Sequence, residues 1–118
     1  VQNGVFKNLR HGEYEARYVL DLHHHTVEQA RTAVYEFILD AFARHERCVL
    51  ILHGRGTKAA KPALLKRFVN AWLPQMEYVL AFHSAQKRDG GTGAVYVLLR
   101  KSEHASEENR ELFSRRQP

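Results

Sequence analysis

An unbroken apolar run from Cys48 to Leu52 constrains the fold of this chain more than any other segment. The run has the length of a strand, and it stops at His53-Gly54-Arg55-Gly56, where two glycines break the extended pattern. Helical patterns lie on both sides of it. We therefore expect a β–α–β unit in which this run is the second strand, with a right-handed crossover that makes the two strands parallel.

The segment before this run has the pattern of a strand followed by a helix. Residues 17–23 alternate, with one face formed by Tyr18, Leu20 and Leu22 and the other by Val19, Asp21 and His23. Thr26 and Gln29 have the spacing of a capping box. A helix over about 27–44 is predicted from apolar residues at helical spacing: Val27, Ala30, Val34, Phe37, Ile38 and Ala41.

The second half of the chain predicts one more helix and two more strands. Pro62 suits the first turn of that helix, whose apolar face contains Leu64, Leu65, Phe68, Val69, Trp72 and Leu73. Residues 78–85 and 94–100 have strand patterns and are joined by a glycine-rich loop over 86–93. The element order predicts an α/β fold in which a small sheet is layered with two helices.

The composition fits one domain, because 118 residues with 44% hydrophobic content leave little room for a second core. We predict an N-terminal extension over 1–16, the domain itself over 17–101 and a charged C-terminal tail over 102–118. The tail alternates acidic and basic residues and has the composition of a solvated helix or a disordered segment. Whether the extension covers a functional site or only lengthens the fold stays open at this stage.

Cysteine usage and hydropathy bear on the location of the protein. Cys48 is the single cysteine, so no disulfide can form within the chain, and we expect a reducing cytoplasm. No apolar run approaches the roughly 20 residues that a membrane-spanning helix needs. We therefore expect no membrane partner.

The net charge of +5 indicates an anionic partner, although a merely solvated basic surface gives the same number. The distribution of charge favours nucleic acid, because basic residues are crowded into two segments. They are Arg55, Lys58, Lys61, Lys66 and Arg67 in the first, and Lys87 and Arg88 in the second.

Polar side chains follow the first two predicted strands. If these strands are neighbours, His23 and His53 both lie at their carboxyl ends, the edge where open α/β sheets bind ligands, and Asp21 shares a face with His23. The glycines after His53 allow backbone amides to approach an oxyanion closely. The alternative is structural, because a tight turn from strand to helix needs glycine whatever the function.

Three motifs in this order resemble the Smr, or small MutS-related, family, in its stand-alone proteobacterial branch. They are Leu20-Asp21-Leu22-His23, His53-Gly54-Arg55-Gly56 and Gly90-Gly91-Thr92-Gly93-Ala94-Val95-Tyr96-Val97, and the resemblance spans about residues 18–100. The chain departs from the family at His24, where glycine is frequent, and at Thr57-Lys58, where many members have histidine and serine.

The resemblance implies a fold and an activity. The fold is a two-layer α/β sandwich, β-α-β-α-β-β with a four-stranded mixed sheet, similar to the C-terminal domain of translation initiation factor three. The activity is that of an endonuclease that cleaves RNA or nicks DNA. The functional signature of the family corresponds here to Asp21, Leu22, His23, His53, Gly54 and Gly56.

Our mechanistic hypothesis makes His23 and His53 an acid–base pair, without deciding which is the base, and lets Asp21 orient one imidazole. On RNA the 2′-hydroxyl can act as nucleophile without a metal, whereas DNA calls for a water activated by a divalent metal such as magnesium or manganese. The predicted substrate-binding residues are Leu22, Gly54, Arg55, Gly56, Lys58, Lys87, Arg88, Gly90 and Gly91.

Two alternatives remain. His23 and His25, as alternate residues of a strand, would ligate one zinc ion together with Asp21, although no further ligand completes the set. A non-catalytic RNA-binding or ribosome-associated module would use the same basic loops to contact phosphates.

Overall fold

The computed structural model describes residues 2–55 and 64–102. In chain order the elements are α1 (Asn3–Arg10), β1 (Tyr18–Asp21), α2 (Val27–Ala43), β2 (Cys48–Leu52), α3 (Leu64–Trp72), η1 (Leu73–Gln75), β3 (Val79–Ser84), η2 (Lys87–Asp89), η3 (Gly91–Gly93) and β4 (Ala94–Leu99), where η denotes a single 3₁₀ turn. The predicted order of strands and longer helices is confirmed. Pro62 and the basic residues between 56 and 63 lie outside the described residues.

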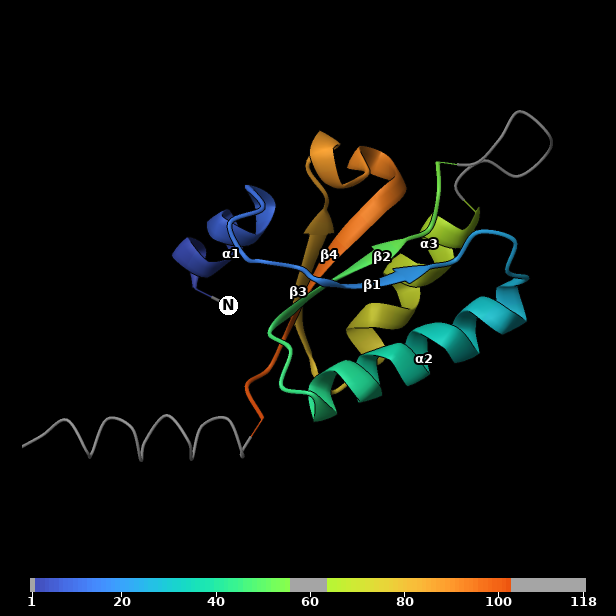
Figure 1. Ribbon diagram of the computed structural model, residues 1–118, viewed down its shortest axis with the longest axis horizontal. Coiled ribbons are helices and arrows are strands. Elements are labelled where there is room, and N and C mark those ends of the chain that lie inside the picture. The colour runs from blue at the N-terminus through green and yellow to red at the C-terminus, as the bar shows by residue number, and fades with distance from the viewer. Residues whose placement is uncertain (1, 56–63, 103–118) are drawn as a thin grey trace, which may run out of the picture.

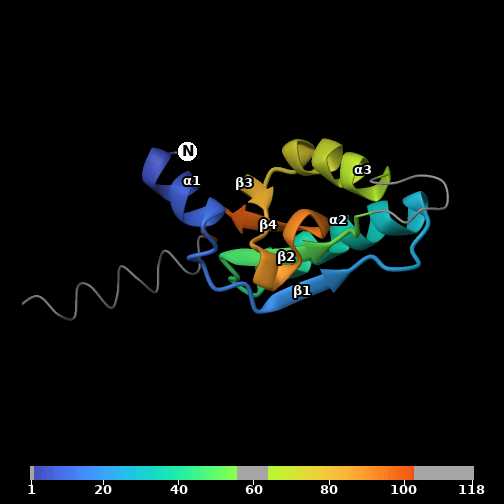
Figure 2. The ribbon, with the colours of Figure 1, turned by 90° about the horizontal axis from the view of Figure 1, so that it is seen from above.

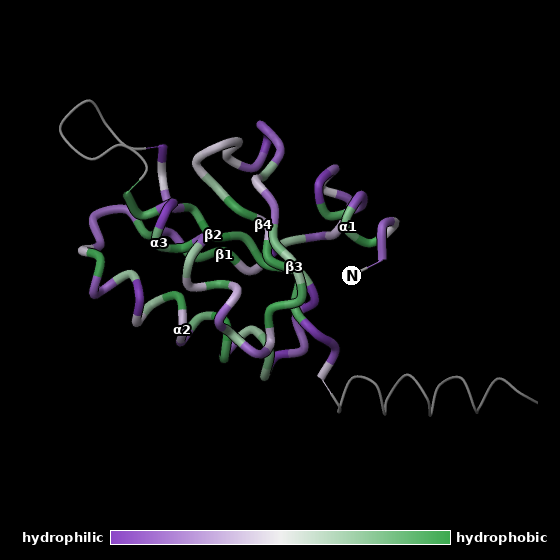
Figure 3. Tube along the Cα trace, turned by 180° about the vertical axis from the view of Figure 1, so that it is seen from behind, coloured by the Kyte–Doolittle hydropathy of each residue, from purple (hydrophilic) through white to green (hydrophobic). Residues whose placement is uncertain are grey.

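The four strands form one mixed sheet in the order β1-β2-β4-β3 (Figure 1). β1 and β2 are parallel, as predicted, and β4 runs antiparallel to both of its neighbours. Figure 3 shows the strands as the most hydrophobic part of the chain, because the two central strands are covered on both faces. The four-stranded mixed sheet expected from the sequence is therefore confirmed.

Helix α2 begins where the sequence predicts and is bonded to the first residue of β1. The Thr26 hydroxyl accepts a hydrogen bond from the Gln29 N–H, and the Gln29 side chain accepts one from the Thr26 N–H, which completes the capping box. The Tyr18 hydroxyl of β1 donates to the Asp40 carboxylate of α2, which also pairs with Arg44. The capping box thus fixes the start of α2, and the Tyr18–Asp40 bond holds the C-terminal part of the helix against the edge strand.

Two hydrophobic clusters cover the two faces of the sheet. The larger one joins α2, α3 and the inward residues of the sheet, among them Ile38, Ile51 and Val97. The second lies on the opposite face, where Leu9 of α1 is fully buried against Leu50 and other residues of the sheet. Figure 2 shows α1 apart from α2 and α3. The predicted N-terminal extension therefore contributes a helix to the fold, outside the two layers that α2, α3 and the sheet form.

The first residue of the predicted C-terminal tail contacts the segment that follows α2. Ser102 was assigned to the charged tail, but it is buried and its hydroxyl bonds Nδ1 of His45, just after α2. This contact adds Ser102 to the packed domain, and residues 103–118 lie outside the described part of the chain. Within the described ranges, no helix is long and apolar enough to cross a membrane.

If α1 is an integral part of the domain, Leu9→Ala should lower the free energy of unfolding by about 2 to 5 kcal/mol, because it removes a fully buried leucine side chain. Urea denaturation followed by circular dichroism measures the change. Asn8→Ala, at an exposed position of the same helix, should leave stability nearly unchanged. Equal stability of the Leu9 variant and the wild type would show that α1 is only loosely attached.

Candidate active site

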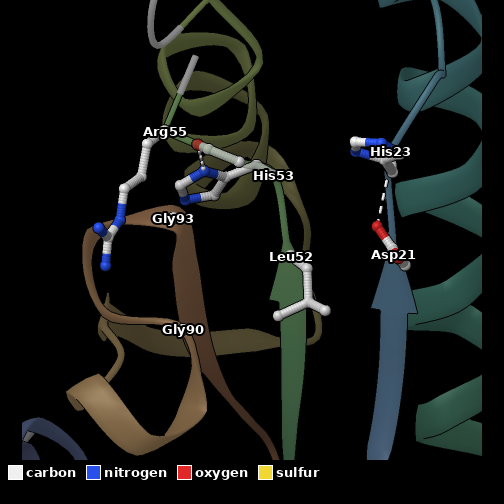
Figure 4. Close-up of a pocket in the computed structure, with 8 residues that line it drawn as sticks. Asp21, His23, Leu52, His53, Arg55, Gly90 and Gly93 are labelled. Carbon is white, nitrogen blue, oxygen red and sulfur yellow. Dashed lines mark hydrogen bonds between the residues drawn. The ribbon is translucent and has the colours of Figure 1, made fainter. Parts of the chain in front are cut away.

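A pocket of about 330 Å³ lies at the carboxyl ends of β1 and β2 (Figure 4). It is lined by Asp21, His23, Leu52, His53, Gly54, Arg55, Gly90 and Gly93. The structure thus brings together the three residues predicted to be catalytic and three of those predicted to bind substrate. Leu52 and Gly93 were missed, although Leu52 ends the apolar run and Gly93 lies within the third motif.

The pairing of β1 with β2 creates this arrangement. Asp21 is in register with Leu52, and the Leu22 N–H donates to the Leu52 carbonyl at 2.9 Å. His23 and His53 therefore leave two adjacent strands at the same level and line one pocket. This is the edge of an α/β sheet at which ligands usually bind.

His53 is held as a neutral imidazole. Its side chain is only 7% exposed, and its Nδ1 lies 2.8 Å from the carbonyl oxygen of Gly54, so Nδ1 carries the proton and donates it. Nε2 is then the nitrogen that can accept a proton. Burial lowers the pKa of His53. The hydrogen bond to the Gly54 carbonyl opposes this lowering in part, and the positive charge of Lys66 adds a smaller lowering.

Asp21 makes a different contact from the expected one. Its Oδ1 accepts a hydrogen bond from the backbone N–H of His23 at 2.9 Å, instead of an imidazole N–H. This bond turns the chain out of β1, which ends at Asp21 and does not reach His23. The carboxylate therefore fixes the path of the backbone that carries His23 to the pocket, a typical role for aspartate in turns.

His24 has a backbone conformation that favours glycine. Its φ is +64°, in the left-handed region, and its ring lies edge-on to the His23 ring with centroids 4.0 Å apart. This is the position where the Smr family often has glycine. The departure seen in the sequence therefore places a strained residue beside one of the candidate catalytic histidines.

Arg55 lies over the turn between β3 and β4 (Figure 4). A Cβ added at Gly91 would stand 3.0 Å from its Nη2, and one at Gly93 would stand 3.2 Å from its Cγ. The absence of side chains at Gly91 and Gly93 thus leaves room for the arginine. The guanidinium of this exposed residue supplies a positive group at the pocket, suited to an oxyanion.

The structure limits what two of the predicted substrate-binding residues can contribute. Leu22 is fully buried in the larger core cluster, so it anchors the turn from inside and cannot touch a substrate. The Gly54 amide, expected to hold a phosphate, donates to the Gly93 carbonyl at 2.9 Å, and the His53 amide donates to the same oxygen. The backbone here joins β2 to the β3–β4 loop.

The remaining predicted contacts lie outside the pocket lining or outside the described residues. Gly91 is buried behind the lining, and Lys87 and Arg88 are exposed on η2. Gly56 and Lys58 fall between the described ranges. Cys48 takes no part in the site, because burial raises the pKa of its thiol to about 12.

The zinc alternative required residues 23–25 to be extended, and this is wrong, because they form a turn in which Nδ1 of His25 lies 3.2 Å from the His23 carbonyl oxygen. Among residues 2–55 and 64–102, no three histidine, cysteine, aspartate or glutamate side chains converge as a metal site. Asp21 is the carboxylate that lines the pocket.

Comparison with known proteins points to one family. The sequence model of the Smr domain matches residues 20–100. The chain is 38% identical over 117 residues to "Probable DNA endonuclease SmrA" of Escherichia coli (strain K12), covering 98% of this chain and 63% of that protein. It is 36% identical over 96 residues to "Ribosome rescue factor SmrB" of Tolumonas auensis, covering 81% of this chain and 52% of that protein. The chain thus spans about half to two thirds of these relatives.

Two solved structures have the same fold. YdaL, a stand-alone small MutS-related protein from Escherichia coli, superposes with a TM-score of 0.74 at 40% identity, covering 86% of this chain and 78% of that one. The Smr domain of Thermus thermophilus MutS2 gives 0.64 at 29% identity, covering 70% and 98%.

The backbone at His24 can be tested by comparing two substitutions. His24→Gly should be more stable than His24→Ala by about 1 kcal/mol, since both lose the ring but only alanine keeps a Cβ at positive φ. His11, exposed with a φ of −85°, is the control position, where glycine should not exceed alanine. Thermal unfolding measures both pairs, and the same order at the two positions would contradict the strain at His24.

Proposed function

This chain belongs to the Smr domain family, and from that premise we propose that it is an endonuclease that cleaves phosphodiester bonds in RNA at the pocket between β1 and β2. The observation that carries the proposal is His53, a buried neutral imidazole whose Nδ1 is occupied and whose Nε2 is available as a base, in a pocket that His23 also lines.

The geometry divides the work between the two histidines. His53 takes the proton from the nucleophilic oxygen, because its lowered pKa keeps it unprotonated near neutral pH. His23, which is exposed on the opposite wall, donates a proton to the leaving oxygen. Asp21 positions His23 through its backbone, and the Arg55 guanidinium stabilises the charge that develops on the phosphate.

RNA is the substrate that these groups could cleave without an external nucleophile. The 2′-hydroxyl is an internal nucleophile, so deprotonation by His53 forms the new phosphorus–oxygen bond and gives a 2′,3′-cyclic phosphate when the 5′-oxygen leaves with a proton from His23. DNA has no such hydroxyl. Asp21 is the one carboxylate among the lining residues, and no three candidate ligands converge within the described residues, so a metal here would have to take most of its ligands from substrate phosphates and water.

A second function has support from the relatives. Several of them carry the name ribosome rescue factor, so a ribosome-associated role of this chain is the competing proposal. In its non-catalytic form the same basic surface holds RNA and the histidines only contribute to binding. Cleavage assays separate the two proposals.

We expect the purified protein to cleave labelled single-stranded RNA in EDTA and to leave 2′,3′-cyclic phosphate ends. His53→Gln and His23→Gln should each lower the rate by about 10²-fold or more, because each removes one proton-transfer group. RNA affinity should change little in these variants. Product ends are identified by gel mobility before and after phosphatase treatment.

His83→Gln is the matched control, since His83 lies on β3 with its Nδ1 bonded to the Ser84 carbonyl and does not line the pocket. Binding without cleavage by the wild type would favour the non-catalytic module. Nicking of DNA that requires magnesium would instead identify an activated water as the nucleophile.

The pKa of His53 predicts the pH dependence. Because burial lowers it, the acidic limb of kcat/KM should have its midpoint below about 6.5, the ordinary value for histidine. Lys66→Gln removes a charge that also lowers this pKa, so the limb should move to higher pH. Arg67→Gln, at an exposed neighbouring position, should leave it in place. A wild-type acidic limb with its midpoint well above about 6.5 would contradict His53 as the base.

A further inference from the structure

We propose that the nucleic-acid strand leaves the pocket over η2 and crosses the C-terminal turn of α1, where Lys87, Arg10 and Lys7 contact its phosphates. This surface deepens the proposed function, on which it rests, by giving the path of the substrate. It lies partly outside residues 20–100, the range matched by the Smr domain.

The C-terminal turn of α1 is fastened to the loop that forms one wall of the pocket. The Gln86 side-chain amide donates to the Arg10 carbonyl at 2.8 Å, and Nη2 of Arg88 donates to the Gly12 carbonyl at 2.8 Å. The contact is close, because a Cβ at Gly12 would stand 2.7 Å from both the Arg88 Nη2 and the Tyr96 hydroxyl. Arg88 therefore docks α1 on the loop, in addition to any contact with substrate.

Tyr96 of β4 also holds this loop, through two hydrogen bonds of its hydroxyl. The Tyr96 hydroxyl donates to the Asp89 carboxylate and accepts the Gln86 N–H at 3.2 Å. Gly90 and Gly93, further along the loop, line the pocket. In Figure 1 the end of β2, the η2–η3 loop and α1 follow one another along one side of the molecule.

The charges along this side are basic and exposed. Lys7 and Arg10 lie in the last turn of α1, Lys87 lies on η2, and none of the three has an ion pair within residues 2–55 and 64–102. Residues 2–12 contain no aspartate or glutamate. Asp89 is engaged by Tyr96 and Arg88, so the carboxylate nearest to Lys87 in the chain is already neutralised.

The width of the sheet sets how long a substrate must be to reach from the pocket to α1. β3, on which α1 rests, is two strand spacings from β2, or about 10 Å. This separation exceeds the rise between neighbouring phosphates of one strand in a regular duplex, about 3.4 Å, so the path from the pocket to α1 spans more than one nucleotide. A substrate confined to the pocket does not reach Lys7 or Arg10.

The test compares the double variant Lys7→Glu/Arg10→Glu with Arg31→Glu/Lys101→Glu, which changes the net charge equally. Arg31 is exposed on α2, on the opposite face of the sheet, and Lys101 is exposed beyond the end of β4 that lies away from the pocket. Both variants are assayed by binding and cleavage of a labelled dinucleotide RNA and a labelled RNA of about 16 nucleotides.

We expect the α1 variant to bind the longer RNA about tenfold or more weakly. The plot of the logarithm of its association constant against the logarithm of the salt concentration should become shallower by about 1.4, the value for two phosphates of a single strand. Its cleavage of the shorter RNA, and its kcat on the longer one, should equal those of the wild type. The control should bind normally. Lys87→Glu, which leaves α1 intact, should weaken binding of the longer RNA in the same way.

Each outcome decides one of the two proposals. Normal binding of the longer RNA by the α1 variant, or equal losses in variant and control, would overturn the surface and leave the nuclease intact. A selective loss in the α1 variant and in Lys87→Glu, with no cleavage by any protein, would support the surface and overturn the nuclease.

Discussion

The parallel pairing of β1 with β2 is the constraint on which the rest of the structure depends. It places Asp21 opposite Leu52 and lets the Leu52 carbonyl accept the Leu22 N–H, so both chains turn away from the sheet at one level. A shift of one residue would reverse the faces of β1, exposing Tyr18 and Leu20 and burying Asp21. The burial of Leu22 and the capping box of α2 hold the register, so the same contacts stabilise the fold and assemble the site.

Much of the fold follows from the sequence, because its strongest signals are local. The run from Cys48 to Leu52 becomes β2 with the predicted bounds, and the capping box starts α2 at the predicted residue. The packing of α1 could not be predicted in this way. Leu9 is the one fully buried residue of that helix, and its partners on the sheet lie some 40 residues or more further along the chain. Val5 and Leu9 do have helical spacing, but so short a pattern does not show which face of the sheet the helix covers.

The main residues of the site could be predicted from the sequence, but their contacts could not. Motif positions and strand order were enough to bring Asp21, His23 and His53 to one pocket. Alternation along residues 17–23 put Leu22 on the face of Tyr18 and Leu20, which is the buried one, whereas the family signature put it among the substrate contacts, and the structure agrees with the alternation. Neither signal showed that the Gly54 amide is already bonded. Hydrogen bonds between the β2 exit and the Gly93 carbonyl depend on three-dimensional pairing, which no single motif contains.

The pocket itself offers a phosphate few free donors, and this shapes how substrate must be held. The amides of His53, Gly54 and Gly93 are used within the fold, which leaves Arg55 as the cation that lines the pocket. These backbone bonds tie the pocket walls to the fold, and one arginine among the lining residues offers few contacts to a polyanion. Affinity for a nucleic acid then has to come from phosphates outside it. The basic side formed by η2 and α1 lies where such phosphates would pass, and its attachment to the pocket loop keeps the two in a fixed relation.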